Sequence, residues 1–450
     1  MVDLSKLKRK NIAVIGDSML DEYYYVTANR ISPEFPIPVS KTNKEEPDIT
    51  RPGGAANVCY QLKNFDVGCN LYSIVDSKGF DFIINNGFDA SGCFMPHKAI
   101  MPRKKRYYNG TFPLYRWDVE DNSYGLNQND FKEAVKKVYY EANKDNKDVI
   151  ICSDYNKGMF STGLDMEFNC RTIVDPKCQP ISRWKNCTIF KPNQKEAYEL
   201  SGLTDWKQQC DYFQKELNCC GVVITCGENG VACKFNEYFY YKILRPINPD
   251  NFIGAGDCFA AFLAYALAND YYYQDCVSIA AEAASAFGEK KLNDPITPRE
   301  LAARFDPRAS KMVDVEDLLD RTYKLVFTNG CFDVFHYGHL STLREASKFG
   351  DKLVVALNTD ESIKRIKGED RPVHCLKQRK DLIAALDFVD YVIDFNEDSP
   401  YEVLRRLKPE VLVKGGDYSK EDVIGREFSR EVEIVPFLEN LSTTRILNEF

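Results

Sequence analysis

The stretch FTNGCFDVFHYGHL, residues 327–340, holds two of the four histidines of a 450-residue chain, His336 and His339. The segment follows an apolar run and carries Gly338 between the two histidines, so it is expected to lead from a strand through a turn into a helix. Residues three apart share one face of a helix. Two imidazoles at a helix N-terminus can donate hydrogen bonds to nucleotide phosphates and stabilise the charge that grows as pyrophosphate leaves.

Zinc binding and plain packing are the two alternatives to phosphate binding by this histidine pair. A zinc site needs further nitrogen, sulfur or carboxylate ligands, and none stands at a suitable spacing near the pair. The histidines could also pack against the core or cap the helix without any chemistry. The TNG-x-FD segment that precedes them in a strand, turn and helix pattern favours the nucleotide site.

A second segment with chemical potential is GAGD, made of Gly254, Ala255, Gly256 and Asp257 ahead of an apolar helix. Glycines let a ligand approach the backbone, and the helix N-terminus adds partial positive charge, so a phosphate under transfer can bind there. A carboxylate at the same place can accept the proton of an attacking hydroxyl. The competing hypothesis is that Asp257 only caps the helix.

Further polar segments stand where short apolar runs, the expected strands, come to an end. In RPGGAANV, residues 51–58, the amide of Asn57 can hydrogen-bond sugar hydroxyls. TCGENG at 225–230 is a polar glycine turn. Each segment alone could be a loop or a helix cap. Together with IGDSMLD and KPNQKEAYEL, these segments contain further candidates of the first half: Asp17, Gly53, Gly54, Asn57, Asn193, Glu196, Thr225 and Gly227.

The elements that must position these residues follow an α/β pattern. Short apolar runs alternate with longer helical stretches through about residue 305, as in a parallel sheet covered by helices. The same alternation of apolar runs and helical stretches begins again at KLVFTNG, after a charged segment that contains a proline. We therefore expect a first domain over residues 1–305, a linker and helix over 306–322, and a second, smaller domain over 323–450.

Composition limits the possible partners and location. The formal net charge of -8 argues against nucleic acid or a membrane surface as a partner, because both select an excess of Lys and Arg. No apolar run approaches the ~20 residues of a membrane span, and no signal-peptide core stands near the start. The 16 cysteines are scattered and are expected to be reduced. We expect a cytoplasmic protein with small-molecule partners.

On GAGD, RPGGAANV, SDYNKG, VDPK and the glycine turn at 225–230, the first ~300 residues resemble the ribokinase-like (PfkB) family of sugar kinases. The resemblance implies an α/β/α sandwich that binds ligands at the carboxyl ends of its strands, with Asp257 as the base. The implied sugar site contains Asp17, Gly53, Gly54, Asn57, Asp154, Lys157 and Lys177. The implied ATP site contains Asn193, Glu196, Thr225, Gly227, Gly254, Ala255 and Gly256, with magnesium near Asn193 and Glu196.

One segment departs from that family. Its members usually carry Asp-x-Thr directly before Gly-Ala-Gly-Asp, whereas Asn251, Phe252 and Ile253 stand here. Asp257 and the glycines are kept. The difference motivates an alternative hypothesis in which the first half has lost catalysis and serves as a binding or dimerisation module.

The second half, through FTNGCFDVFHYGH and the late ENLSTTRIL, resembles the cytidylyltransferase-like nucleotidyltransferases, with a Rossmann-like α/β domain. The resemblance implies that His336 and His339 are catalytic and that a sugar or alcohol phosphate attacks the α-phosphate of a nucleoside triphosphate. Nearby cations in IKGEDRPV and LKQRK can bind phosphate. The nucleotide-binding residues expected here are Thr328, Asn329, Gly330, Phe332, Lys367, Arg371, Arg379, Ser442, Thr443 and Thr444.

The order of the two halves, with RISPEFPIPV and VLVKGGDY, resembles the bifunctional heptose enzymes of ADP-heptose synthesis. That likeness implies ATP-dependent phosphorylation of D-glycero-D-manno-heptose 7-phosphate at carbon 1, then adenylyl transfer from ATP to heptose 1-phosphate. Magnesium is expected in both sites, and a homodimer is implied by resemblance alone. The same architecture acting on another sugar phosphate, or with CTP, remains open at this point.

Overall fold

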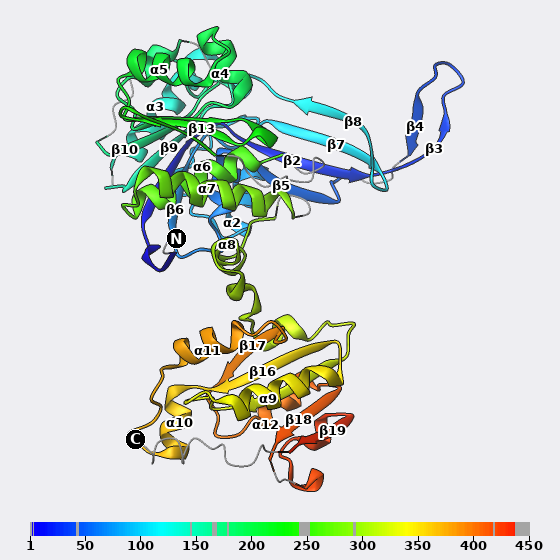
Figure 1. The fold of residues 1–450 in the computed structure, drawn as a ribbon. Coiled ribbons are helices and arrows are strands. Elements are labelled where there is room, and N and C mark those ends of the chain that lie inside the picture. Colours follow the sequence, from blue (N-terminus) through cyan, green and yellow to red (C-terminus); the bar gives the residue numbers. More distant parts are fainter. Residues whose placement is uncertain are drawn as a thin grey trace. The chain divides into compact units, whose positions relative to one another are not determined.

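The computed structural model describes residues 2, 4–41, 45–144, 146–163, 169–177, 180–242, 253–290, 294–416 and 419–436 (Figure 1). The chain divides into two compact units, Met1–Leu301 and Ala302–Phe450. The segment expected to be a linker, 306–322, lies in the second unit and contains the 3-10 helices Pro307–Lys311 and Val315–Leu318. Each unit is an α/β structure, as predicted from the alternating pattern.

The first unit is built on an eight-stranded sheet of order β14-β13-β12-β11-β10-β9-β1-β6. Its strands are β1 (Asn11–Gly16), β6 (Gly68–Tyr72), β9 (Val149–Ser153), β10 (Arg171–Asp175), β11 (Ile189–Phe190), β12 (Gly221–Thr225), β13 (Val231–Phe235) and β14 (Tyr238–Lys242). The first six strands are parallel, while β13 and β14 join antiparallel at one edge. Five of the six β1 residues are buried, as expected for a strand covered on both faces.

Helices cover both faces of this sheet, with α3, α4 and α5 on one side and α6 and α7 on the other (Figure 1). The helices are α1 (Ala55–Gln61), α2 (Ser77–Asn85), α3 (Gln128–Lys144), α4 (Gln194–Ser201), α5 (Trp206–Leu217), α6 (Ala255–Ala268), α7 (Tyr273–Gly288) and α8 (Pro298–Phe305). Helix α6 is apolar all round and almost wholly buried, because α1, α7 and the sheet pack against it. Its N-terminus is therefore held rigidly at the edge where the parallel strands end.

A second, four-stranded sheet of order β5-β2-β7-β8 extends from the first unit (Figure 1). Its strands are β5 (Ile49–Gly54), β2 (Ser18–Tyr25), β7 (Arg103–Asn109) and β8 (Phe112–Val119). The hairpin of β3 (Thr27–Ile31) and β4 (Pro38–Lys41) continues from β2. Strand β2 starts directly after β1, and β5 runs directly into α1, so the second sheet is tied to the first at the predicted sugar site.

The second unit contains a five-stranded parallel sheet of order β17-β16-β15-β18-β19. The strands are β15 (Leu325–Gly330), β16 (Lys352–Asn358), β17 (Tyr391–Phe395), β18 (Val411–Gly415) and β19 (Glu431–Val435), and the helices are α9 (Tyr337–Ala346), α10 (Asp360–Lys367), α11 (Leu376–Ala384) and α12 (Tyr401–Leu407). Alternate residues of the central strands face two apolar cores, one on each side. Strand β15 therefore ends in the middle of the sheet, where TNG begins the predicted nucleotide site.

No helix among the described residues is long and apolar enough to cross a membrane. All cysteines in the described ranges are free thiols.

Candidate active sites

Asp257 lies in the first turn of α6 and is almost completely buried, with 3% of its surface exposed. The Asn57 side-chain amide donates a hydrogen bond to one carboxylate oxygen at 2.7 Å, and the Tyr155 hydroxyl donates to the other at 2.7 Å. The N-cap of α6 is Gly254, and no side chain in the described part of the chain caps this helix end. Asp257 is therefore not a helix cap, which removes the competing hypothesis for the GAGD segment.

Two glycines allow the two helix ends to meet at this carboxylate. Gly54 and Gly254 are the N-caps of α1 and α6, with φ angles of 60° and 88° that L side chains rarely adopt. A Cβ on Gly254 would lie only 2.8 Å from the Asn57 amide nitrogen. Gln61, one turn further along α1, donates to the Asn57 oxygen at 2.9 Å and so orients its amide toward Asp257.

Burial raises the pKa of Asp257 to about 6, against the opposing hydrogen bonds from Tyr155 and Asn57. Nearby Asp175 raises it further and Lys191 lowers it. A carboxylate with a pKa near 6 is still mostly ionised at neutral pH, yet it is a stronger base than an exposed aspartate. Its environment suits a group that accepts a proton from a substrate hydroxyl.

Asp17, a predicted sugar-site residue, directly follows β1 and lies in a network of internal hydrogen bonds. Its side chain is fully buried, and its oxygens accept hydrogen bonds from the backbone N–H groups of Tyr155, Lys157 and Met159 at 3.0–3.1 Å and from the Tyr124 hydroxyl at 3.2 Å. Asp17 thus anchors the loop that carries Tyr155. All of these bonds hold the protein itself, and the sugar contact of Asp17 stays a prediction.

Asp154 has a similar internal role, since its carboxylate accepts from the backbone N–H groups of Asn156 and Lys177. Lys157 pairs with Glu120 at 2.7 Å. Gly53 lies beside Asp21, whose carboxylate oxygen would be 2.9 Å from a Cβ added to this glycine. The predicted residues of the sugar site thus converge on one region, where Asp17 and Asp154 also hold the loops.

The predicted ATP residues come together around a pocket with a volume of about 550 Å³. Its walls come from the start of α4, the turn after β12 and the first turn of α6. The pocket contains five predicted residues: Asn193, Thr225, Gly227, Ala255 and Gly256. Because the N-terminus of α6 forms one wall, its free N–H groups can bind phosphate beside Asp257.

Asn193 and Glu196 form a capping box at the start of α4, with side-chain to backbone hydrogen bonds of 2.8 and 2.9 Å in both directions. Glu196 also lies 3.6 Å from Lys177, and Asp175 pairs with Lys191 at 3.0 Å. No group of three or more metal-ligating side chains occurs in the described part of the chain. This mixture of carboxylates and lysines fits magnesium carried by the phosphates of ATP rather than magnesium caged by protein.

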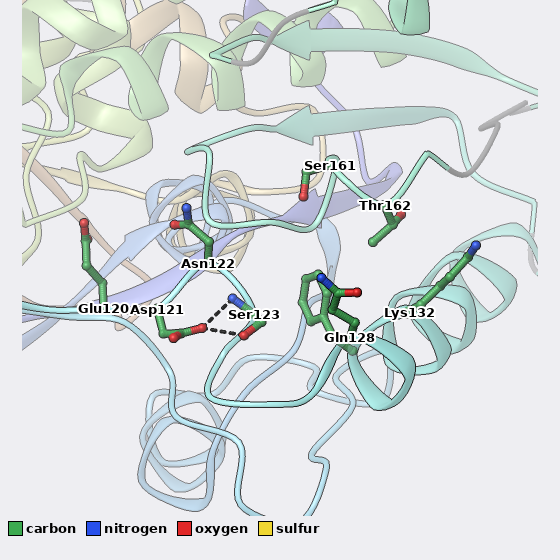
Figure 2. Close-up of a pocket in the computed structure, with 9 residues that line it drawn as sticks. Glu120, Asp121, Asn122, Ser123, Gln128, Lys132, Ser161 and Thr162 are labelled. Carbon is green, nitrogen blue, oxygen red and sulfur yellow. Dashed lines mark hydrogen bonds between the residues drawn. The ribbon is translucent and has the colours of Figure 1, made fainter.

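A larger cavity of about 770 Å³ lies between the loop after β8, the start of α3 and the segment around Ser161 (Figure 2). Asp121 accepts hydrogen bonds from the Ser123 backbone and hydroxyl in its wall. None of the predicted site residues that the structure describes lines this cavity. Size alone therefore does not identify the active site of the first unit.

In the second unit the histidine pair has the predicted placement. His336 is the N-cap of α9, and His339 lies in the first turn. Their rings stack with centroids 3.8 Å apart, and within the described ranges the buried Nδ1 atoms of both have no hydrogen-bond partner. Phe332 packs against His339 from a left-handed backbone conformation with φ 46°. Packing, not capping, positions the imidazoles.

Burial lowers the pKa of His339 to about 4, with smaller contributions from His336 and Lys367. Burial also lowers the pKa of His336. Both imidazoles are therefore neutral at pH 7, and each can donate one N–H hydrogen bond without an added positive charge. Lys367 stands close enough to affect His339, which agrees with its predicted place in the nucleotide site.

The two predicted arginines are engaged inside the unit. Arg379 is only 1% exposed and donates to the carbonyls of His374 and Cys331 and to the Asp360 carboxylate, at 3.0, 2.8 and 2.7 Å. These bonds make Arg379 an internal brace, and its phosphate contact stays a prediction. Arg371 pairs with buried Asp333 at 2.7 Å and keeps part of its surface exposed.

Two residues that the sequence motifs did not single out lie in these sites. Tyr155 touches Asp257, and its only sequence signal is its place inside SDYNKG. Lys414, in the VKGG segment at the end of β18, donates to the Asn329 side chain at 3.0 Å, and burial lowers its pKa. Thr328 and Gly330 lie with Asn329 at the end of β15, whereas Ser442, Thr443 and Thr444 lie outside the described residues.

Comparisons with known proteins identify two family domains in the chain. The pfkB family carbohydrate kinase model matches residues 165–295, and the cytidylyltransferase-like model matches 327–447. A bifunctional protein HldE of Campylobacter jejuni (strain RM1221) is 34% identical over 468 residues, covering 100% of this chain and 99% of the relative. The HldE of Aliarcobacter butzleri (strain RM4018) is 32% identical over 480 residues, covering 98% and 97%. The chain belongs to the HldE family of bifunctional proteins.

Solved structures support the fold of the first unit. A ribokinase from Thermotoga maritima covers 66% of this chain and 99% of its own, with a TM-score of 0.54 at 18% identity. Phosphofructokinase-2 from Escherichia coli, in complex with potassium, covers 66% and 98% with a TM-score of 0.52 at 15% identity. The ribokinase-like fold predicted from the sequence is confirmed.

Membership of the HldE family also confirms the bifunctional resemblance. The chain is a bifunctional transferase of ADP-heptose biosynthesis, a heptose phosphate kinase joined to a heptose phosphate adenylyltransferase. ATP is a substrate of both activities.

Proposed function

We propose that each unit holds one complete active site and that Asp257 is the base of the kinase step. The carbon 1 hydroxyl of D-glycero-D-manno-heptose 7-phosphate attacks the γ-phosphorus of ATP, the bond to ADP breaks, and the hydroxyl proton passes to Asp257. The observation that carries this assignment is the buried carboxylate, held by Asn57 and Tyr155 beside the nucleotide pocket.

In the second unit, a phosphate oxygen of heptose 1-phosphate attacks the α-phosphorus of a second ATP, and the bond to pyrophosphate breaks. His336 and His339 donate hydrogen bonds to the phosphates and stabilise the charge of the leaving pyrophosphate. Neutral, stacked imidazoles at the start of α9 support this role. Lys367, Arg371 and Lys414 provide positive charge around the same site.

The proposal includes magnesium bound with ATP in both sites, where it neutralises phosphate charge. Asn193, which lines the kinase nucleotide pocket, and Glu196 of the same capping box are the residues that can contact it through water. We also propose a cytoplasmic homodimer whose partners are sugar phosphates and ATP. Sedimentation of the purified protein tests the dimer.

The experiment that tests one site per unit uses two variants of the full chain. Asp257→Asn is expected to abolish phosphorylation of heptose 7-phosphate and to leave ADP-heptose formation from heptose 1-phosphate intact. His339→Ala is expected to do the reverse. Both reactions are followed by phosphorus NMR with magnesium and ATP.

Loss of both steps in either folded variant would contradict the separation of the sites. Failure of the unmodified protein in the first reaction alone would favour the alternative in which the kinase unit is a binding module. Use of CTP in preference to ATP in the second reaction would change the nucleotide but not the architecture.

A further inference from the structure

Strand β7 carries four consecutive cations, Arg103, Lys104, Lys105 and Arg106. Side chains alternate between the two faces of a strand, so the four cations divide into two pairs. Arg103 and Lys105 both contact Glu22, at 3.3 and 3.9 Å. Lys104 and Arg106 therefore belong to the opposite face of the second sheet.

On that opposite face, the carboxylates nearest Lys104 in register are already paired with other cations. Its cross-strand neighbours are Asp21 on β2 and Asp118 on β8. Asp21 pairs with Arg106 and Asp118 pairs with Arg116, at 2.5 and 2.8 Å. No carboxylate of the described ranges forms an ion pair with Lys104. The pKa of Lys104 is lowered, mainly because the side chain is partly buried. A half-buried cation in this position is costly unless an anion joins it.

The direction of the Lys104 side chain connects it to the kinase site. Its ammonium lies over the Tyr155 ring, 5.5 Å from the ring centroid, and the hydroxyl of the same ring contacts Asp257. Lys104 and the base are thus separated by one tyrosine side chain, a separation that a seven-carbon sugar can span. The described wall of the ATP pocket has no residue of the second sheet, so Lys104 stands on the side of the acceptor sugar.

We infer that Lys104 is a specificity residue that binds the phosphate already present on the sugar acceptor, and so selects a phosphorylated sugar over a neutral one. The inference rests on the proposed kinase function of the first unit. The other lysines close to this region have carboxylate partners, since Lys157 pairs with Glu120 and Lys177 with Glu196. Lys104 forms no such ion pair among the described residues, so its ammonium group can donate hydrogen bonds to a phosphate dianion.

The test compares two acceptors by isothermal titration calorimetry with the full chain: heptose 7-phosphate and the same heptose without phosphate. Lys104→Met keeps the length of the side chain and removes its charge. We expect it to weaken binding of heptose 7-phosphate by about 10- to 100-fold, the usual effect of losing a hydrogen bond to a charged group. Binding of neutral heptose should change by less than about twofold, because that ligand lacks the phosphate.

Two control variants complete the design. Lys105→Met removes a neighbouring cation from the other face of β7 and should leave the preference for the phosphorylated sugar unchanged, while Lys104→Arg should restore most of the affinity. Equal loss for both sugars, or no loss for either, would overturn the inference. Because binding is measured without turnover, a protein that binds heptose 7-phosphate through Lys104 but does not phosphorylate it would refute only the proposed kinase function.

Discussion

The hydrogen bond from Tyr155 to Asp257 allows a quantitative prediction of how Tyr155→Phe changes the pH dependence of the kinase step. Tyr155→Phe removes one hydroxyl and keeps the aromatic ring that lies near Lys104 and Lys177. Asp257 is buried with a pKa of about 6, and the Tyr155 bond is the first of the contributions that lower this pKa. Without that bond the ionised carboxylate loses a donor, so its pKa must rise.

The size of the rise follows from the strength of such bonds. A hydrogen bond to a charged group contributes about 1.5–3 kcal/mol, and one pKa unit corresponds to about 1.4 kcal/mol, so the pKa should increase by roughly 1–2 units. Starting from about 6, the ionised fraction at pH 7 falls from about 90% to between about 50% and 10%. The kinase kcat/KM at pH 7 should therefore fall roughly 2- to 10-fold and recover as the pH rises toward 9.

The assay is the pH profile of kinase kcat/KM for the unmodified protein and Tyr155→Phe, followed by ADP release. Substrate phosphates also titrate near pH 6, but their contribution is the same for both proteins, so the difference between the two acidic limbs reports the enzyme. Adenylyl transfer by the second unit serves as the folding control. The assignment of Tyr155 as the group that positions Asp257 and keeps it ionised would be refuted by either of two results. One is an acidic limb of the Tyr155→Phe profile with the same midpoint as that of the unmodified protein; the other is a loss of kcat/KM that is equal at every pH.

Three further outcomes are expected in the second unit. The NMR signals of His339 should show no protonation between about pH 5 and 8, because its pKa is about 4, and a midpoint above 6 would contradict its burial. Lys414→Met should slow adenylyl transfer at least about tenfold by removing a half-buried cation beside Asn329, without changing the kinase step; Lys420→Met, at an exposed pair, is its control. Arg379→Ala should lower the free energy of opening of β15 and β16, measured by hydrogen exchange, by about 3–5 kcal/mol. The variant leaves Asp360 and two carbonyls without this donor. Lys377→Ala, at an exposed pair on the same helix, should change that stability by less than about 1 kcal/mol, and equal effects of the two variants would show that Arg379 is no brace.

The sequence was most informative where local chemistry decides the structure. Apolar runs that alternate with helical stretches specify an α/β fold, since each run needs helices on both faces to be buried. Gly254, directly ahead of α6, predicted a phosphate site because the backbone conformation that glycine allows is local. The spacing of His336 and His339 likewise placed both imidazoles at one helix start, and their rings do stack there.

Contacts between distant segments could not be predicted from spacing. Tyr155 meets Asp257 because β9 and α6, 102 residues apart at this contact, are packed side by side in the folded unit. The same limit explains why the internal contacts of two predicted site residues were not foreseen. An aspartate after a strand and an arginine in a charged run give no local sign of burial, yet Asp17 and Arg379 each satisfy several internal groups.

By itself, the sequence determined the order of two α/β units, the helix starts proposed to bind phosphate and the residue types available for proton and phosphate transfer. The tertiary structure alone decided which of these polar groups face a ligand and which hold the protein together. The physical reason is that a buried charge must be matched by partners from several elements, and only the folded chain shows which charges, such as Asp17, are matched internally and which, such as Lys104, are left for a substrate.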